Sequence, residues 1–118
     1  MKSFTITVMG EYPKVERVSV PGTSVSYINP KYPCFVHRDY RYYEPEGNPN
    51  INNRPHYYSN WVVSELNTGA AITTGKTRAQ AIENAKGKLK EVGDQGMEIA
   101  IKAYKERLAK YDLAAKGN

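Results

Sequence analysis

Alternating apolar and polar residues open the chain and predict β-strands. In Ser3–Met9, apolar side chains occupy every second position, which is the spacing of a strand with one buried face. Lys14–Val20 repeats this alternation more weakly, and Pro21-Gly22 is expected to end it. Ser24–Ile28 and Cys34–Arg38 are two further strand candidates. The N-terminal part of the chain therefore predicts a β-sheet.

A later apolar stretch predicts a β-hairpin. Within Tyr57–Glu65, Trp61 and Val63 share one face and Val62 lies on the other, so this strand is expected to be buried on both sides. The turn residues of the segment 67–69 follow, and Ala70–Thr74 returns as the partner strand.

Residues 39–56, which precede this hairpin, have no periodic pattern. They contain Pro45, Gly47, Pro49, Pro55 and four asparagines, which interrupt regular structure. We expect a long loop, and a loop of this length in a compact domain is usually functional or mobile.

Helical spacing dominates residues 76–118. The apolar positions predict one helix over residues 78–92 and a second over 95–115. Gly93 is expected to end the first helix in the left-handed conformation, and Asp94 to cap the second. Gly87 inside the first helix is tolerable if a strand packs closely against it.

The second predicted helix carries an apolar stripe that recurs every three or four residues. This stripe can pack on the chain's own sheet or on a second copy of the chain. Because the segment is short for a free-standing coiled coil, packing within the chain is the expectation and a homodimer through this helix is the alternative. The stripe consists of Met97, Ile101, Tyr104, Leu108, Tyr111 and Ala115.

These elements predict a single α+β domain over residues 1–118. Residues 1–75 form an N-terminal antiparallel sheet of four to six strands, with the long loop at 39–56, and two C-terminal helices in residues 76–118 cover it. A chain of 118 residues is long enough for one such core.

The letters Gly75-Lys76-Thr77 also end a phosphate-binding P-loop. A P-loop needs four residues between its first glycine and this triplet, whereas Gly69 and Gly75 enclose five. It also needs a buried parallel strand before it, whereas a hairpin is predicted here. The same letters fit a helix start, in which Thr77 and Gln80 form a reciprocal capping box. We therefore expect no nucleotide binding here.

Composition and charge narrow the function classes. The net charge of +5 is concentrated in residues 76–118, which is compatible with an acidic partner such as nucleic acid. Cys34, the single cysteine, cannot form an internal disulfide, and we find neither a signal-peptide pattern nor an apolar run of spanning length. The expected location is the cytoplasm, without membrane contact.

Candidate catalytic and metal chemistry is sparse. Cys34, His37 and His56 lack the paired spacing of metal ligands, and no third group that would orient a Cys–His pair is recognisable. We expect no metal, no cofactor and no enzymatic activity.

Aromatic and basic residues interleave on both sides of the long loop. Five of the ten tyrosines and three arginines lie in residues 37–43 and 54–58, which meet at one end of the sheet if the flanking strands pair. Tyr and Arg are enriched at protein-binding hot spots, and the same pair can stack bases and contact phosphates. Alternatively, the tyrosines pack on their own strands. The candidate contact residues are Arg38, Tyr40, Arg41, Tyr42, Tyr43, Arg54, Tyr57, Tyr58, Lys76 and Arg78.

Residues 60–89 resemble a known family in their strand–turn–strand–helix pattern. The stretch from Gly75 to Ala85, G-x-T-x-x-x-A-I-x-x-A, is similar to HicB-type antitoxins, which use a small αβ domain to sequester an RNA-cleaving toxin. The D-L-P-G-C run of that family is here "SELNTG", and no DNA-binding tail follows. The chain as a whole also resembles phage anti-CRISPR inhibitors in its general character.

Both resemblances imply a protein of phage or mobile-element type that acts by occupying the surface of another macromolecule. The expected function is therefore non-enzymatic inhibition or regulation of a nucleic-acid-processing protein. The alternative is direct binding of RNA or single-stranded DNA through the same residues.

Overall fold

The computed structural model describes residues 2–10, 13–42 and 55–116, which form one antiparallel sheet and one long helix. The sheet is a meander in the order β1-β2-β3-β4-β5, so each strand pairs with its neighbour in sequence. Its strands are β1 (Lys2–Met9), β2 (Val15–Ser24), β3 (Cys34–Tyr42), β4 (Pro55–Glu65) and β5 (Ala71–Gly75). The helix α1 (Arg78–Lys116) follows β5 directly. The predicted α+β class, the antiparallel sheet and its number of strands are confirmed.

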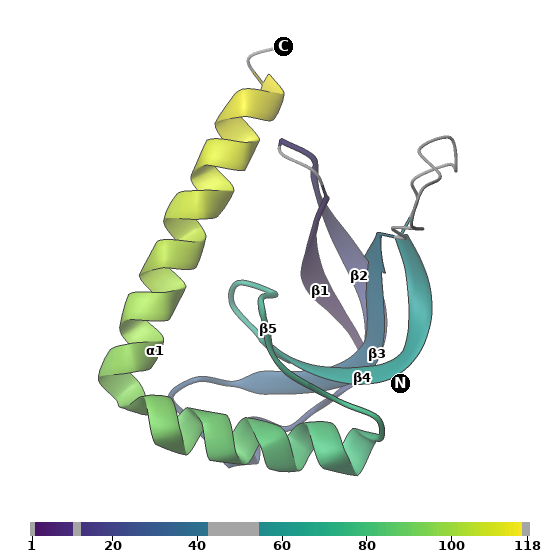
Figure 1. Ribbon diagram of the computed structural model, residues 1–118, viewed down its shortest axis with the longest axis vertical. Helices are drawn as coiled ribbons and strands as arrows, with labels where there is room; N and C mark the ends of the chain where they lie inside the picture. The colour runs from purple at the N-terminus through teal and green to yellow at the C-terminus, as the bar shows by residue number, and fades with distance from the viewer. Residues whose placement is uncertain (1, 11–12, 43–54, 117–118) are drawn as a thin grey trace.

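The sheet curls strongly, so that its two ends approach each other (Figure 1). The turn between β4 and β5 reaches the edge strand β1, where the Thr7 amide donates to the carbonyl of Gly69 over 3.2 Å. The Thr7 hydroxyl donates to the carbonyl of Thr68 over 2.9 Å. The predicted hairpin is confirmed by the antiparallel pairing of β4 with β5. Its turn also bonds to the edge strand β1 at the other end of the sheet.

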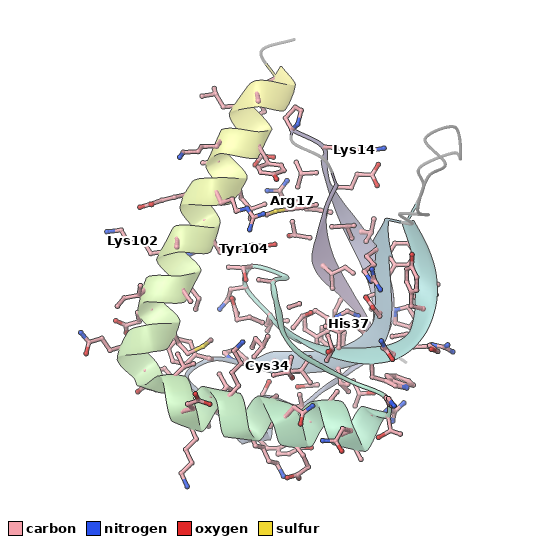
Figure 2. The ribbon with its side chains drawn as sticks, in the orientation of Figure 1. Lys14, Arg17, Cys34, His37, Lys102 and Tyr104 are labelled. Carbon is pink, nitrogen blue, oxygen red and sulfur yellow. The ribbon has the colours of Figure 1, made fainter. Side chains whose placement is uncertain are left out.

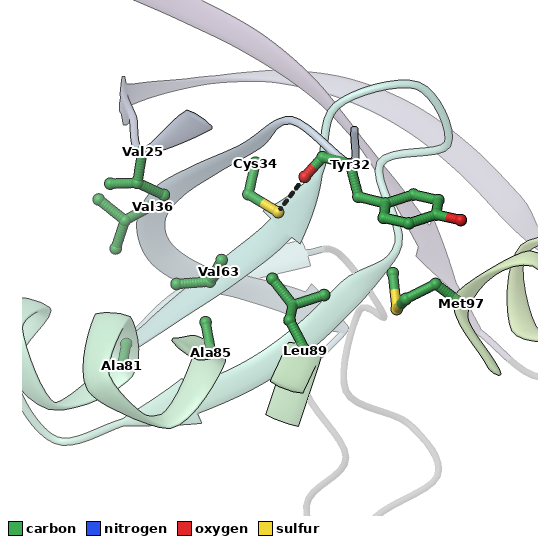
Figure 3. Close-up of a cluster of buried hydrophobic side chains, with 9 residues drawn as sticks. All are labelled: Val25, Tyr32, Cys34, Val36, Val63, Ala81, Ala85, Leu89 and Met97. Atoms are coloured by element: carbon green, nitrogen blue, oxygen red, sulfur yellow. Dashed lines mark hydrogen bonds between the residues drawn. The ribbon is translucent and has the colours of Figure 1, made fainter. Parts of the chain in front are cut away.

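Alternation along the strands gives the sheet two buried faces. Cys34, Val36 and Val63 point toward α1 and pack against its small residues Ala81 and Ala85 (Figure 3). The opposite face is filled by a second apolar cluster, Ile6, Val8, Val20 and Phe35. The prediction that the hairpin's first strand is buried on both sides is confirmed, because Val62 and Val63 are both buried.

Two strand predictions are wrong in detail. Ser26–Ile28 forms a short 3₁₀ helix, η1, because the Ile28 amide donates to the Val25 carbonyl three residues earlier. Pro21-Gly22 does not end β2, which continues to Ser24. The β2–β3 ladder covers only Gly22–Ser24, so the missing N–H of Pro21 removes no bond from it.

The predicted loop at residues 39–56 is too long at both ends. Asp39–Tyr42 belongs to β3, and β4 already begins at Pro55, because the two strands pair as far as Tyr42 and Pro55. The remainder of that prediction, residues 43–54, lies outside the described residues.

The two predicted helices are the two parts of α1, which meet without an intervening loop at a bend where the backbone of Gly93 is not helical (Figure 1). Gly93 has φ 73° and ψ 173°, so the predicted positive φ is present but the left-handed helical conformation is not. Beyond the bend, the Tyr32 hydroxyl donates to the Asp94 carbonyl over 2.9 Å, and the Lys31 ammonium lies 3.4 Å from the Glu98 carboxylate. The bend is thus stabilised by the loop before β3.

The apolar stripe after the bend packs within the chain as far as Tyr111, and the side chain of Ala115 lies outside the description. Met97, Leu108 and Tyr111 are buried, and Ile101 joins the core cluster on the helix side of the sheet. Arg17 of β2 forms a bidentate ion pair with Asp112, with Nη2 and Oδ2 2.9 Å apart. A homodimer through α1 would therefore have to use the opposite side of the helix.

The helix start has the predicted cap in part. The Gln80 amide donates to the Thr77 hydroxyl over 3.1 Å. The Gln80 side chain does not return to Thr77 but donates to Asn84 over 2.8 Å. The triplet from Gly75 to Thr77 therefore leads from an antiparallel strand into a capped helix.

Gly87 does not serve the close packing predicted for it. A Cβ built on Gly87 has no atom within 4 Å apart from the helix's own backbone, and the residue is exposed. Gly87→Ala should therefore raise the free energy of unfolding by about 0.8–1 kcal/mol, the helix propensity difference between the two residues. Urea unfolding followed by circular dichroism measures this change, and a loss of stability would show that the position requires glycine.

Candidate partner-binding surface

Pairing of β3 with β4 brings the two predicted aromatic and basic runs together. Tyr40 lies opposite Tyr57, and Arg41 lies opposite His56. The register shifts between Arg38 and Tyr40, where Asp39 faces the segment 58–60 of β4. This irregularity changes the direction of the side chains at the strand ends. The prediction that the two runs meet at one end of the sheet is confirmed for the described residues.

One aromatic pair and one arginine–tyrosine pair occupy this end of the sheet. The rings of Tyr40 and Tyr57 have their centroids 4.5 Å apart, and the guanidinium of Arg41 lies 4.1 Å from the centroid of Tyr58. Arg41 Nε also donates to Asp39 Oδ2 over 3.0 Å, which neutralises its charge locally. Tyr57 is 51% exposed, whereas Tyr40 packs partly on the cluster around Phe35. We gave as an alternative that the tyrosines pack on their own strands. Tyr40 does so in part, whereas Tyr57 does not.

Trp61 extends this surface into a groove. The guanidinium of Arg78, at the start of α1, lies 5.0 Å from the Trp61 ring centroid, and that of Arg38 lies 5.9 Å from it. We call this hollow the Trp61 groove; its volume is about 440 Å³. It is lined by Pro21, Gly22, Thr23, Val36, Arg38, Tyr57, Trp61 and Arg78.

We expected Trp61 in a strand buried on both sides and did not include it among the contact residues. Alternation correctly placed Trp61 on the same face as Val63, and this face points toward α1. Trp61 lies at the edge of this buried face, however, and is only half-buried. The sole tryptophan of the chain beside a run of tyrosines and arginines was the signal that could have identified it.

The arginines of the Trp61 groove have no carboxylate partner within residues 2–10, 13–42 and 55–116. The ion pairs of that part of the chain involve other cations, whereas Arg38 donates only to the Tyr58 carbonyl over 3.4 Å. Two guanidinium groups beside one indole therefore give the groove a local positive charge.

The remaining predicted contact residues are placed less completely. Lys76 is exposed in the turn between β5 and α1 and does not line the groove. Tyr42 ends β3, but its side chain lies outside the description, and Tyr43 and Arg54 lie outside the described residues altogether. The described aromatic–basic surface therefore consists of Arg38, Tyr40, Arg41, Tyr57, Tyr58, Trp61 and Arg78.

His37 lies inside the curl of the sheet, with its ring beside that of Phe35 (Figure 2). Its Nδ1 is 2.7 Å from the Arg38 carbonyl, so Nδ1 carries the proton, and Nε2 accepts from the Ser64 hydroxyl over 2.7 Å. Burial lowers the pKa of His37. Both side chains are almost fully buried, so the pair satisfies its own polar groups inside the sheet.

Cys34 behaves as a small core residue. It is buried, its thiol donates to the Tyr32 carbonyl over 3.1 Å, and burial raises its pKa to about 11. A thiol of that pKa is a poor nucleophile at neutral pH. Within the described ranges, no group of three or more His, Cys, Asp or Glu side chains is arranged to hold a metal ion.

The buried His37 makes stability depend on pH. Because its pKa is lowered in the folded state, the unfolded chain binds more protons below the ordinary histidine value of 6.5. Stability is therefore complete above this pH and decreases as the pH falls from it through the lowered pKa. Urea unfolding at pH 7.5 and 5.5 measures the loss, which should shrink in His37→Gln. An equal loss in both proteins would assign it to other groups.

No protein-family model, curated protein or solved structure matches this chain. Within the described part of the chain, no helix has the length and apolar character needed to cross a bilayer.

Proposed function

We propose that this chain is a non-enzymatic binding protein of phage or mobile-element type. In this proposal it inhibits or regulates a nucleic-acid-processing protein by covering part of that protein's surface, as an antitoxin or an anti-CRISPR inhibitor does. The resemblance of residues 60–89 to HicB-type domains supports the class of partner. The observation that supports the mode of action is the aromatic–basic surface at the end of β3 and β4.

The composition of this surface favours a protein partner. Trp, Tyr and Arg are the residue types enriched in binding hot spots, because they bury large areas and make directed contacts. Here Tyr57, which lines the Trp61 groove, is held by its ring contact with Tyr40, and Tyr58 is held by the Arg41 guanidinium over its ring. Side chains held in place before binding lose less entropy when a partner covers them.

A pull-down from a lysate of the source cells tests this proposal. The Tyr57→Ala/Tyr58→Ala protein should recover the partner at least about tenfold less well than the wild type, the loss expected for one hot spot of 1.4 kcal/mol or more. Tyr27→Ala is the matched control, because Tyr27 is 69% exposed and belongs to η1, outside this surface. Equal recovery of every protein by all three baits would remove this surface from the proposed function.

The two arginines beside Trp61 support a second candidate, binding of RNA or single-stranded DNA. An aromatic ring with adjacent cations can stack a base and contact a phosphate. In that case affinity should decrease log-linearly with rising salt, and Arg78→Ala should reduce the slope by about one. The absence of any fluorescence change of Trp61 with single-stranded oligonucleotides at low salt would reject this candidate.

A further inference from the structure

We infer that the Trp61 groove receives an acidic protein segment, in which an apolar side chain inserts between Arg38 and Arg78 and neighbouring carboxylates pair with them. This inference rests on the proposed function and names the chemical class of the contact. It starts from the shape of the groove, its charge and its rigidity.

The shape of the groove follows from the sheet. The β2–β3 ladder ends at the pair Gly22 and His37, and the next position on β2 is Pro21, which has no N–H to donate. The hollow lies at this end of the ladder, with Pro21, Val36 and the Trp61 ring as its apolar part. A volume of about 440 Å³ lies within the range of small binding pockets and leaves room for an apolar side chain.

The charge of the groove is local. Arg38 and Arg78 have no carboxylate partner within the described ranges, whereas the neighbouring Arg41 is paired with Asp39. A groove that follows a nucleic-acid backbone needs successive cations along the strand. Two cations around one apolar hollow instead match one or two carboxylates beside an apolar side chain. This arrangement favours an acidic protein segment over a polyphosphate chain.

The groove is held in shape by regular structure on each side. Trp61 pairs with Arg38 on one side and with Gly75 on the other, so its backbone is fixed within the sheet. Arg78 is the first residue of α1 and follows the Thr77 cap directly. Gly75 has no room for a side chain, because a Cβ there would lie 2.5 Å from the Ala81 nitrogen, so β5 and the start of α1 are in close contact. The backbones of both Trp61 and Arg78 are therefore held by regular structure.

The chain contains its own reporter for this groove, because Trp61 is its single tryptophan. Three probes are pentapeptides with a central phenylalanine, flanked by four glutamates, four serines or four lysines. The fourth probe is a pentaglutamate without the phenylalanine. The glutamate–phenylalanine peptide should change Trp61 emission saturably. Loss of either the charges or the ring should weaken binding about tenfold, the effect of about 1.4 kcal/mol.

Matched arginine variants locate the contact. Arg38→Ala and Arg78→Ala should each weaken the glutamate–phenylalanine peptide about tenfold, as expected when a charge-assisted pair is lost. Arg107→Ala is the control and should leave the affinity unchanged, because Arg107 is exposed on α1 and lies over Tyr111 instead. Thermal unfolding of each variant verifies that these exposed substitutions leave the fold intact.

Three results would overturn the inference. One is equal binding of all peptides, another is no saturable change of Trp61 emission with any of them, and the third is unchanged affinity in Arg38→Ala and Arg78→Ala. Tighter binding of an oligothymidylate, with a log-linear salt slope, would assign the groove to nucleic acid. If no peptide binds but the pull-down still depends on Tyr57 and Tyr58, the groove assignment is rejected and the proposed function stands. If the peptide binds but all baits recover every protein equally, the groove assignment stands and the proposed function is rejected.

Discussion

Gly69→Ala should lower the free energy of unfolding by about 2–4 kcal/mol, the combined effect of backbone strain and steric overlap. Gly69 has φ 70°, which an L side chain rarely adopts. A Cβ at this position would lie 2.9 Å from three backbone atoms of the β1 segment 5–7. Backbone atoms of a paired strand cannot move aside singly, so the turn would have to leave β1.

The contact between Gly69 and β1 also joins the two ends of the curled sheet. Displacing the turn would break the bond from the Thr7 amide to Gly69 and the bond from the Thr7 hydroxyl to Thr68. Urea unfolding measures the loss, and amide exchange at Thr7 should accelerate because its partner is removed. Gly87→Ala is the matched control, since it makes the same change in open space and should stabilise. A Gly69→Ala protein as stable as the wild type would show that the turn does not depend on this contact.

Phe35→Ala should cost about 3–5 kcal/mol, the range for truncating a large buried aromatic side chain. Phe35 is 0% exposed and lies at the centre of the cluster on the face of the sheet away from the first part of α1. Its ring is stacked on Phe4, with the centroids 4.5 Å apart and the planes within 6°. The substitution therefore removes apolar burial and also leaves a cavity between β1 and β3.

Equilibrium unfolding in urea measures this loss, and two controls grade it. Phe35→Leu should cost less, because most of the cavity stays filled, and Phe4→Ala should cost less than Phe35→Ala because Phe4 is only half-buried. A loss below about 1 kcal/mol for Phe35→Ala would mean that the cluster collapses to fill the space or contributes little to the fold.

Local patterns predicted the elements that depend on neighbouring residues. The alternation in Ser3–Met9 predicted β1, because a strand places successive side chains on opposite faces. Thr77 predicted the start of α1, and Gly93 predicted its interruption, because a cap and a positive φ are properties of a few consecutive residues. The meeting of the two tyrosine–arginine runs also followed from sequence, once the flanking strands were assumed to pair.

Long-range packing caused the failures. Asp39–Tyr42 looked like loop sequence but is strand, because pairing with β4 overrides weak local preference. Gly87 was expected to be tolerable if a strand packed closely against it, but none of the described strands approaches it. Trp61 was expected in a strand buried on both sides, but its exposure depends on where the β2–β3 ladder ends and where α1 begins.

The sequence by itself therefore determined the α+β fold class, most of the strand and helix segments, and the residue types that the surface offers. Only the tertiary structure decided that the β4–β5 turn closes on β1, that the loop before β3 holds the bend of α1 at Gly93, and that Arg38 and Arg78 flank Trp61. The physical reason is the range of the interactions. Periodicity and capping act within a few residues, whereas ladder pairing, close backbone contacts and the grouping of side chains join residues that are far apart in the chain.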